Sequence, residues 1–286
     1  MKTLILANNT EKFQSLISSI SSESEQISIC SYKDLAFSLD GRNAQITIYP
    51  SNIKLDEFAK IIVLSTSPHH TRNYIFSALS CYCHKNGIML LDDSFTNTDG
   101  KLYALWRFWF DDIPVAKTFF GPTDFLVQKI AELGGKGILK SVQGTKGKDN
   151  YLVQSEKELQ EALKNHIDTD FVLQNFIPND GDWRIILINF EPKLAIYRSS
   201  HGKDHRNNTS VGGEAKLIPL EEVDPRAIEL SISAARALDI KIAGADIIQD
   251  SSTGELTVLE VNRTPQLATG AFINEKAEVL KNLIRS

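Results

Sequence analysis

The sequence feature that most constrains the fold is a pair of apolar runs around a polar turn, AGADIIQDSSTGELTVLEVN, at residues 243–262. This pattern predicts a β-hairpin. If its loop spans residues 251–255, Asp246 lies directly opposite Glu260 on the two strands. Side chains alternate across a strand, so Asn262 shares the face of Glu260. The hairpin therefore places oxygen-bearing side chains together on one face of a sheet.

Two carboxylates that face each other on a sheet repel, and a cation between them removes the repulsion. Hard oxygen ligands favour Mg²⁺ or Mn²⁺ over softer metals. We therefore expect Asp246, Glu260 and Asn262 to hold Mg²⁺ or Mn²⁺. A solvated hairpin face is the alternative, because paired acids are common on exposed sheets.

Composition excludes several other classes of protein. With 42% apolar and 23% charged residues, the 286-residue chain can bury one large or two ordinary cores, so it is not disordered. The net charge of −5 gives no attraction to nucleic acid or anionic lipid, and we expect neither as a partner. No stretch approaches a membrane span, and the 3 cysteines fit a reducing compartment. We predict a cytoplasmic protein, and the sequence leaves a homo-oligomer open.

The two parts of the chain differ in pattern. Before the polar stretch at 92–99, short apolar runs and one amphipathic stretch predict parallel strands with a crossover helix. Beyond it, Ser155 and Asp224 are placed to cap helices, and the aromatic residues 106–110 are expected to pack in the core. Strands are predicted at 4–7, 61–64, 88–91, 171–173, 183–189 and 194–198, the last two joined by a turn at 190–193.

Two polar loops are candidates for binding anions. The segment KSVQGTKG begins at Lys140 and ends at Gly147, and its glycines let backbone amides approach a phosphate. It lacks the lysine and hydroxyl pair of a Walker loop, and an ordinary hairpin turn is the alternative. The segment HGKDHRNNTSVGGEA contains Arg206, whose planar fork suits phosphate or carboxylate. The alternative for this second segment is a surface loop that binds no ligand.

In order along the chain, these segments resemble the ATP-grasp superfamily, in particular its RimK-like branch of carboxylate–amine ligases. The resemblance rests on Lys101 after Thr-Asp-Gly, IPVAKT, the loop from Lys140, LQNFI, GDWR, HRNN, AGADI and LEVN, and it covers residues 99–266. It implies a mixed α/β and α+β chain with the ATP-grasp fold. A pre-ATP-grasp, Rossmann-like αβ domain would span residues 1–95 and an ATP-grasp domain 96–286. Within the latter we expect a lid at about 115–178 and a C-terminal catalytic subdomain at about 179–286.

The resemblance also implies roles for individual residues. Arg206 would be catalytic, Asp246, Glu260 and Asn262 would bind the metal, and Arg184 and Arg263 would contact substrate. Two positions differ from the family: Asn175 stands where most relatives carry glutamate, and Arg263-Thr-Pro-Gln replaces small residues and a glycine. ATP would be bound by Lys101, Lys140, Gly144, Thr145, Gly147, Gln174, Asn175, Phe176, Ile177, Asp182, Arg206, Asn207 and Asn208.

The implied activity is an ATP- and Mg-dependent ligation that forms an amide or peptide bond through an acyl phosphate and releases ADP and phosphate. ATP would be a co-substrate, and the other partners would be a carboxylate and an amine, each an amino acid or a peptide. Two alternatives stay open. One is a peptide-tailoring enzyme that joins side chains of a precursor peptide, and the other is a nucleotide-binding regulatory module without turnover.

Overall fold

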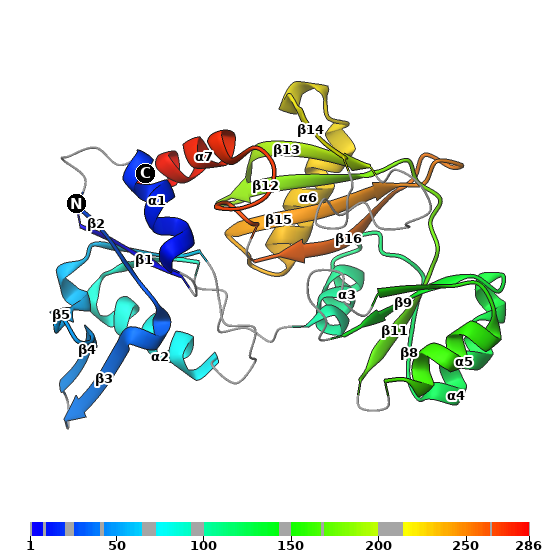
Figure 1. The fold of residues 1–286 in the computed structure, drawn as a ribbon, viewed down its shortest axis with the longest axis horizontal. Helices are drawn as coiled ribbons and strands as arrows, with labels where there is room; N and C mark the ends of the chain where they lie inside the picture. The colour runs from blue at the N-terminus through cyan, green and yellow to red at the C-terminus, as the bar shows by residue number, and fades with distance from the viewer. Residues whose placement is uncertain are drawn as a thin grey trace.

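The computed structural model describes residues 2–7, 10–20, 26–40, 43–64, 73–92, 100–142, 150–166, 169–199, 214–263 and 265–285. Figure 1 shows three groups of elements along the longest axis. The amino-terminal elements lie at one end and a four-stranded sheet with two helices at the other. A five-stranded sheet lies between them.

The amino-terminal elements form the parallel αβ unit that the sequence predicts. Their main sheet has the order β2 (Ile27–Cys30), β1 (Thr3–Leu6), β6 (Lys60–Val63) and β7 (Met89–Leu91), with every pairing parallel. The two central strands, β1 and β6, are buried on both faces, which explains their continuous apolar runs. The other elements of this part are α1 (Thr10–Ile20), α2 (Asn73–Asn86) and a small antiparallel sheet of β3 (Leu35–Asp40), β4 (Asn43–Ile48) and β5 (Ile53–Lys54).

The four-stranded antiparallel sheet has a core of its own. Leu139 and Leu173 from the sheet pack with Leu126 and Leu159 from two helices. Ser155 caps the second helix as predicted, because its hydroxyl accepts a hydrogen bond from the backbone N–H of Glu158. The sheet order is β10 (Asn150–Val153), β9 (Gly137–Ser141), β11 (Phe171–Asn175) and β8 (Thr118–Phe120), and the helices are α4 (Thr123–Lys129) and α5 (Glu156–Lys164).

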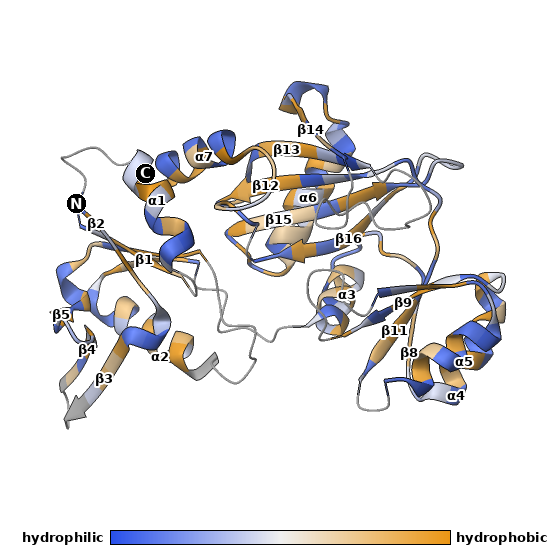
Figure 2. Cartoon of the chain, in the orientation of Figure 1, coloured by the Kyte–Doolittle hydropathy of each residue, from blue (hydrophilic) through white to orange (hydrophobic). Residues whose placement is uncertain are grey.

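The five-stranded antiparallel sheet is the largest, and apolar residues run along much of β12, β13 and β15 (Figure 2). One face packs against α6 through residues such as Ile185, Ala245 and Ala234. Asp224 caps α6 with Pro225 in its first turn, as predicted. The sheet order is β14 (Glu214–Ile218), β13 (Glu191–Ser199), β12 (Asp182–Ile188), β15 (Ile242–Gln249) and β16 (Leu256–Asn262), and α3 (Lys101–Phe110) and α6 (Pro225–Ala237) complete this part.

The last helix, α7 (Ile273–Arg285), joins the amino-terminal sheet to the five-stranded sheet. One continuous apolar core contains Ile62 of β6, Ile196 of β13 and Leu280 of α7. The ammonium of the buried Lys60 also donates to the carbonyl oxygens of Leu283 and Ile284 at the end of α7, both at 3.5 Å. The predicted boundary at residues 95 and 96 lies outside the described residues, and the division into domains stays a prediction.

Two local predictions are wrong. The turn between β12 and β13 is formed by Asn189 and Phe190, with φ of 50° and 63°, and not by residues 190–193. A two-residue turn with positive φ at both positions matches the twist of the two strands. Pro192, which was predicted to lie in the turn, therefore lies within β13. Of the aromatic residues of α3, only Phe108 is buried, because a short helix turns a single face to its neighbours.

Among the described helices, none combines the length and the apolar character that crossing a membrane requires.

Candidate active site

The predicted acids share one face of the five-stranded sheet. Asp246 on β15 lies directly opposite Glu260 on β16, and Asn262 lies opposite Gly244. The hairpin loop is one residue longer than predicted, since Gln249 pairs with Leu256, but a register shift beside Asp246 restores the expected pairing. The predicted opposition of the two acids is therefore confirmed, and their binding of a metal stays a prediction.

Asp246 is held by two arginines of neighbouring strands. Its carboxylate accepts hydrogen bonds from Nε and Nη2 of Arg184 on β12, at 2.5 and 2.8 Å. Arg198 on β13 adds a contact from its Nη2 at 3.1 Å. Burial opposes ionisation of Asp246, but the charges of Arg184 and Arg198 outweigh it and hold the pKa below its usual value. Asp246 is thus a carboxylate at neutral pH.

A second buried ion pair lies beside the first. Asp182 and Arg198 are directly opposite each other on β12 and β13, and both side chains are buried. Asp182 accepts hydrogen bonds from Nε of Arg198 at 3.1 Å and from its Nη2. Sequence reasoning did not find Arg198. The contacts of Asp182 in this structure are those of an ion-pair partner, and its predicted role toward the nucleotide stays a prediction.

The two predicted lysines approach this face from other elements. Lys140 is on β9 of the four-stranded sheet, and Lys101 is the first residue of α3. Burial lowers the pKa of the Lys140 ammonium, and the charge of Lys101 lowers it further. The carboxylates of Glu260 and Asp246 act in the opposite direction. Two lysines and two acids from separate elements therefore lie within electrostatic reach of one another.

Gln174 and Asn175 end β11 in the four-stranded sheet, and Phe176 and Ile177 begin the connection to β12 in the five-stranded sheet. The predicted role of this segment as the hinge that holds adenine stays a prediction. The side-chain amide of Gln174 donates to the hydroxyl of Thr118 at 2.8 Å. In contrast, the side-chain oxygen of Asn175 is buried and accepts no hydrogen bond from the described residues. A buried acceptor without a donor is costly, and the predicted contact of Asn175 with the nucleotide would supply one; that contact stays a prediction.

Several predicted residues lie outside the described residues. They are Gly144, Thr145 and Gly147 of the glycine loop, and Arg206, Asn207 and Asn208 of the second polar loop. Their predicted roles stay predictions.

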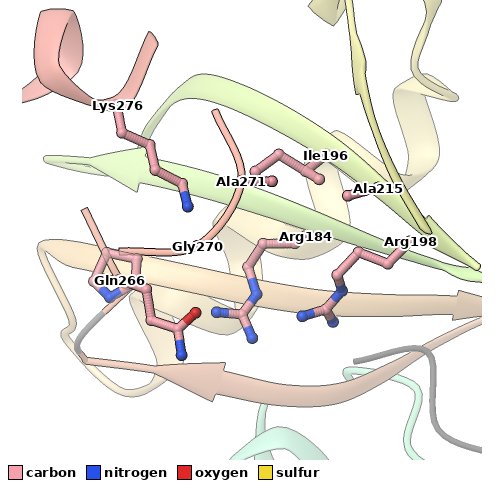
Figure 3. Close-up of a pocket in the computed structure, with 9 residues that line it drawn as sticks. Arg184, Ile196, Arg198, Ala215, Gln266, Gly270, Ala271 and Lys276 are labelled. Carbon is pink, nitrogen blue, oxygen red and sulfur yellow. The ribbon is translucent and has the colours of Figure 1, made fainter. Parts of the chain in front are cut away.

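A small pocket is lined by the two arginines that contact Asp246, and Figure 3 shows its lining residues. Arg184 and Arg198 form its floor, and Gln266 and Lys276 line it from the segment after β16 and from α7. Arg184 therefore reaches both the pocket and Asp246. Arg263 is half-buried directly after β16. Sequence reasoning did not find Lys276, which nothing in its local pattern distinguishes from a surface lysine.

The donor set on the sheet fits a hard divalent cation. The carboxylates of Asp246 and Glu260 and the amide oxygen of Asn262 are the oxygen ligands that Mg²⁺ prefers. Within the described ranges, no cluster of three or more His, Cys, Asp or Glu residues could hold a metal. A metal site here would consist of two carboxylates and an amide, with water and phosphate oxygens completing the shell, and it stays a prediction.

Comparison with known sequences gives one family and several relatives. The model of the RimK-like ATP-grasp domain matches residues 117–286. A probable alpha-L-glutamate ligase of Cellvibrio japonicus is 26% identical over 279 residues, which are 93% of this chain and 89% of that protein. A protein of the same name from Coxiella burnetii is 31% identical over 162 residues, 54% of this chain. That match spans 52% of the Coxiella protein, about half of its length.

Solved structures of similar fold cover nearly the whole chain. The ATP-grasp ligase PsnB, complexed with a phosphomimetic variant of a minimal precursor, Mg and ADP, has a TM-score of 0.73 at 15% identity, over 99% of this chain and 97% of that one. D-alanine–D-alanine ligase from Bacillus anthracis, complexed with ATP, has a TM-score of 0.69 at 13% identity, over 98% and 92%. These identities are low, so the likeness establishes the fold alone, and the predicted ATP-grasp fold is confirmed.

Proposed function

The chain belongs to the RimK-like ATP-grasp family and is an ATP-dependent carbon–nitrogen ligase, and from this premise we propose that it joins a substrate carboxylate to an amine through an acyl phosphate. The amine is an amino acid or a peptide. The observation that carries the proposal is the opposition of Asp246 and Glu260 on a sheet face that Lys140 approaches from the other sheet. This arrangement gathers the charges that a transferring phosphoryl group requires.

The reaction consists of two transfers. A carboxylate oxygen of the substrate attacks the γ-phosphorus of ATP, the bond to the bridging oxygen breaks, and ADP leaves. The amine nitrogen then attacks the acyl carbon, phosphate leaves with the electron pair, and the nitrogen loses a proton to water or a nearby base. The chain contributes positioning and charge neutralisation and no covalent chemistry of its own.

The nucleotide lies between the two sheets in this proposal. Lys140 and Lys101 contact its phosphates, and the hinge from Gln174 to Ile177 holds adenine. The unsatisfied oxygen of Asn175 accepts a hydrogen bond from the base or the ribose. Gly144, Thr145 and Gly147 of the glycine loop contact the phosphates, and so do Asn207 and Asn208. Asp182 is the acid on the nucleotide side of the site.

Asp246, Glu260 and Asn262 would hold Mg²⁺, with Mn²⁺ as the alternative. When bound, the metal supplies Lewis-acid polarisation of phosphate oxygens. Arg184 and Arg198 keep Asp246 ionised and therefore ready to act as a ligand. Arg263 and Arg184 orient the substrate, and Arg206 neutralises the charge that develops on the transferring group, because its planar fork matches two oxygens at once.

A peptide-tailoring activity is the second candidate. PsnB in complex with a minimal precursor, and the macrocyclase MdnC bound with the precursor peptide MdnA, share the fold over the whole chain, with TM-scores of 0.70 and 0.68. Both candidates use the same acyl phosphate chemistry. They differ in whether the carboxylate and the amine belong to separate molecules or to one peptide.

The test is a mass-resolved screen of the full chain with Mg²⁺, ATP and a panel of amino acids and peptides. The proposal expects release of ADP together with a product whose mass is the sum of two substrates less one water. Loss of water from a single peptide supports the tailoring activity instead. Binding of ATP without release of ADP for any member of the panel would contradict both and indicate a regulatory module.

A further inference from the structure

The outer side of α3 carries a group of exposed aromatic side chains. Of the ten large apolar residues that are exposed among the described ones, four lie on this single helix. They are Tyr103, Trp106, Trp109 and Phe110, with exposed fractions of 37%, 60%, 65% and 68%. Their spacings of three and four residues place them on one side of the helix, and we call them the aromatic patch.

The other side of α3 packs against the rest of the chain. Phe108 is buried in the core that the five-stranded sheet shares with α6. Nε of Arg107 donates to the carbonyl oxygen of Ala237 at the end of α6, at 3.2 Å. A helix that is apolar all round is ordinarily buried all round. The aromatic patch is therefore a surface without the cover that its composition requires from the described part of the chain.

α5 shows the usual distribution for a helix at the surface. Its exposed residues are all charged, and its apolar residues Leu159 and Leu163 are buried. Single exposed apolar side chains are common and need no explanation, whereas a contiguous group of them marks an interaction site. Two of the three tryptophans of the chain lie in the aromatic patch, and tryptophan is enriched among the residues that dominate binding energy.

The area of the aromatic patch suits an interface between two copies of the chain. Since an aromatic side chain offers about 150–250 Å², the exposed fractions amount to roughly 500 Å² per chain. This is near the upper end for patches on monomers, which reach about 600 Å². Two such patches face to face would remove about 1,000 Å² from water, the area at which specific interfaces begin.

The aromatic patch is also complementary to itself. Aromatic rings have negative faces and positive edges, so edge-to-face contacts join one aromatic surface to another. Trp106 and Trp109 meet in this way within one chain, with ring centroids 5.5 Å apart and planes at 83°. Arg107, the cation beside the patch, pairs with Asp111 at 2.9 Å and stacks on Phe110. Its charge is thus already matched, and a second aromatic surface requires none.

We propose that the chain forms a homodimer through the aromatic patch, with α3 of one copy against α3 of the other. A two-fold axis lets the same patch serve both copies and closes the assembly at two. Lys101 is on the side of α3 away from most of the patch and toward Lys140, so the dimer leaves the proposed nucleotide site uncovered. The inference does not depend on the proposed reaction.

Sedimentation velocity of the full chain at several concentrations tests the proposal. The wild-type chain should have the mass of two chains and dissociate on dilution. Removing one dominant side chain weakens an interface by about 30-fold or more, and two-fold symmetry removes it twice. Trp106→Ser and Trp109→Ser should therefore each raise the dimer Kd by at least about 100-fold. Phe37→Ser is the matched control, because Phe37 is an exposed aromatic residue of β3 in the amino-terminal part.

Fluorescence links the dimer to the aromatic patch without any substitution. Dilution below the Kd should expose Trp106 and Trp109 to water and shift the tryptophan emission to longer wavelength, in step with the loss of dimer mass. Trp183 is half-buried on β12, where dissociation does not reach it. The double variant Trp106→Ser with Trp109→Ser retains Trp183 and should show no shift on dilution.

Four results would overturn the inference. A wild-type chain that stays monomeric at about 100 μM would mean that the partner of the patch is a different molecule. A dimer that both tryptophan variants retain would place the interface elsewhere. Assemblies larger than two chains would indicate a head-to-tail contact with another surface. A lower unfolding temperature of the variants, at concentrations where the wild type is monomeric, would show that the aromatic side chains stabilise the single chain instead.

Discussion

Two neighbouring regions of the five-stranded sheet bury charge in different ways. The pair of Asp182 and Arg198 is balanced, with two hydrogen bonds joining opposite charges on adjacent strands. A short distance away, Lys276 is buried beside Arg184 and Arg198, and no carboxylate of the described residues pairs with it. A balanced pair can be explained by the fold alone, whereas an unmatched buried charge is typical of a binding site. The comparison predicts which residues hold the site together and which bind.

The largest effect on stability should come from breaking the balanced pair. Asp182→Ala leaves the guanidinium of Arg198 buried with one acid fewer and should lower the free energy of unfolding by about 3 kcal/mol. Chemical denaturation of the full chain measures it. The double variant Asp182→Leu with Arg198→Met removes both charges and should recover part of the loss. A single variant as stable as wild type would contradict the structural role of the pair.

Removal of a charge that binds a ligand should weaken ligand binding and leave the stability of the fold almost unchanged. Lys140→Met should weaken ATP binding by about 10- to 100-fold, since a charge-assisted contact contributes about 1.5–3 kcal/mol, while the unfolding temperature stays within a few degrees. Calorimetry with ATP and Mg²⁺ measures the affinity. Lys157→Met is the control, because Lys157 is exposed on α5 of the same part of the chain. Unchanged affinity in Lys140→Met would assign the loop after β9 to an ordinary hairpin.

Strands such as β6, β11, β12 and β15 could be predicted because alternation and apolar runs reflect burial directly, whereas β8 and β14 were not predicted. The facing acids were also predictable, although the loop is longer than expected, since a bulge compensates for the difference. Arg198 was not. A regular hairpin closed at 190–193 places Arg198 on the face opposite Asp182, and the observed two-residue turn would do the same without the bulge between Ile186 and Leu187, which shifts the register by one residue. A one-residue bulge that the sequence does not announce is enough to conceal an ion pair.

Lys276 could not be found for a different reason. Its helix has an ordinary amphipathic pattern, and lysine is among the residues most often exposed. It is buried because α7 lies between the amino-terminal sheet and the five-stranded sheet, which are far apart in sequence. Predictions for the loops of Gly144 and Arg206 stay untested by the described residues.

The central claim is that the facing acids of the hairpin are the reaction centre of an ATP-dependent ligase. Its most direct test is the rate of ADP formation by Glu260→Gln at saturating Mg²⁺ and ATP, beside Glu255→Gln, a change of an exposed acid on the same hairpin. Loss of one ligand charge should cost several kcal/mol in the transition state, so Glu260→Gln should be slower by about 100-fold or more while Glu255→Gln matches wild type. A rate for Glu260→Gln within about threefold of wild type would contradict the claim.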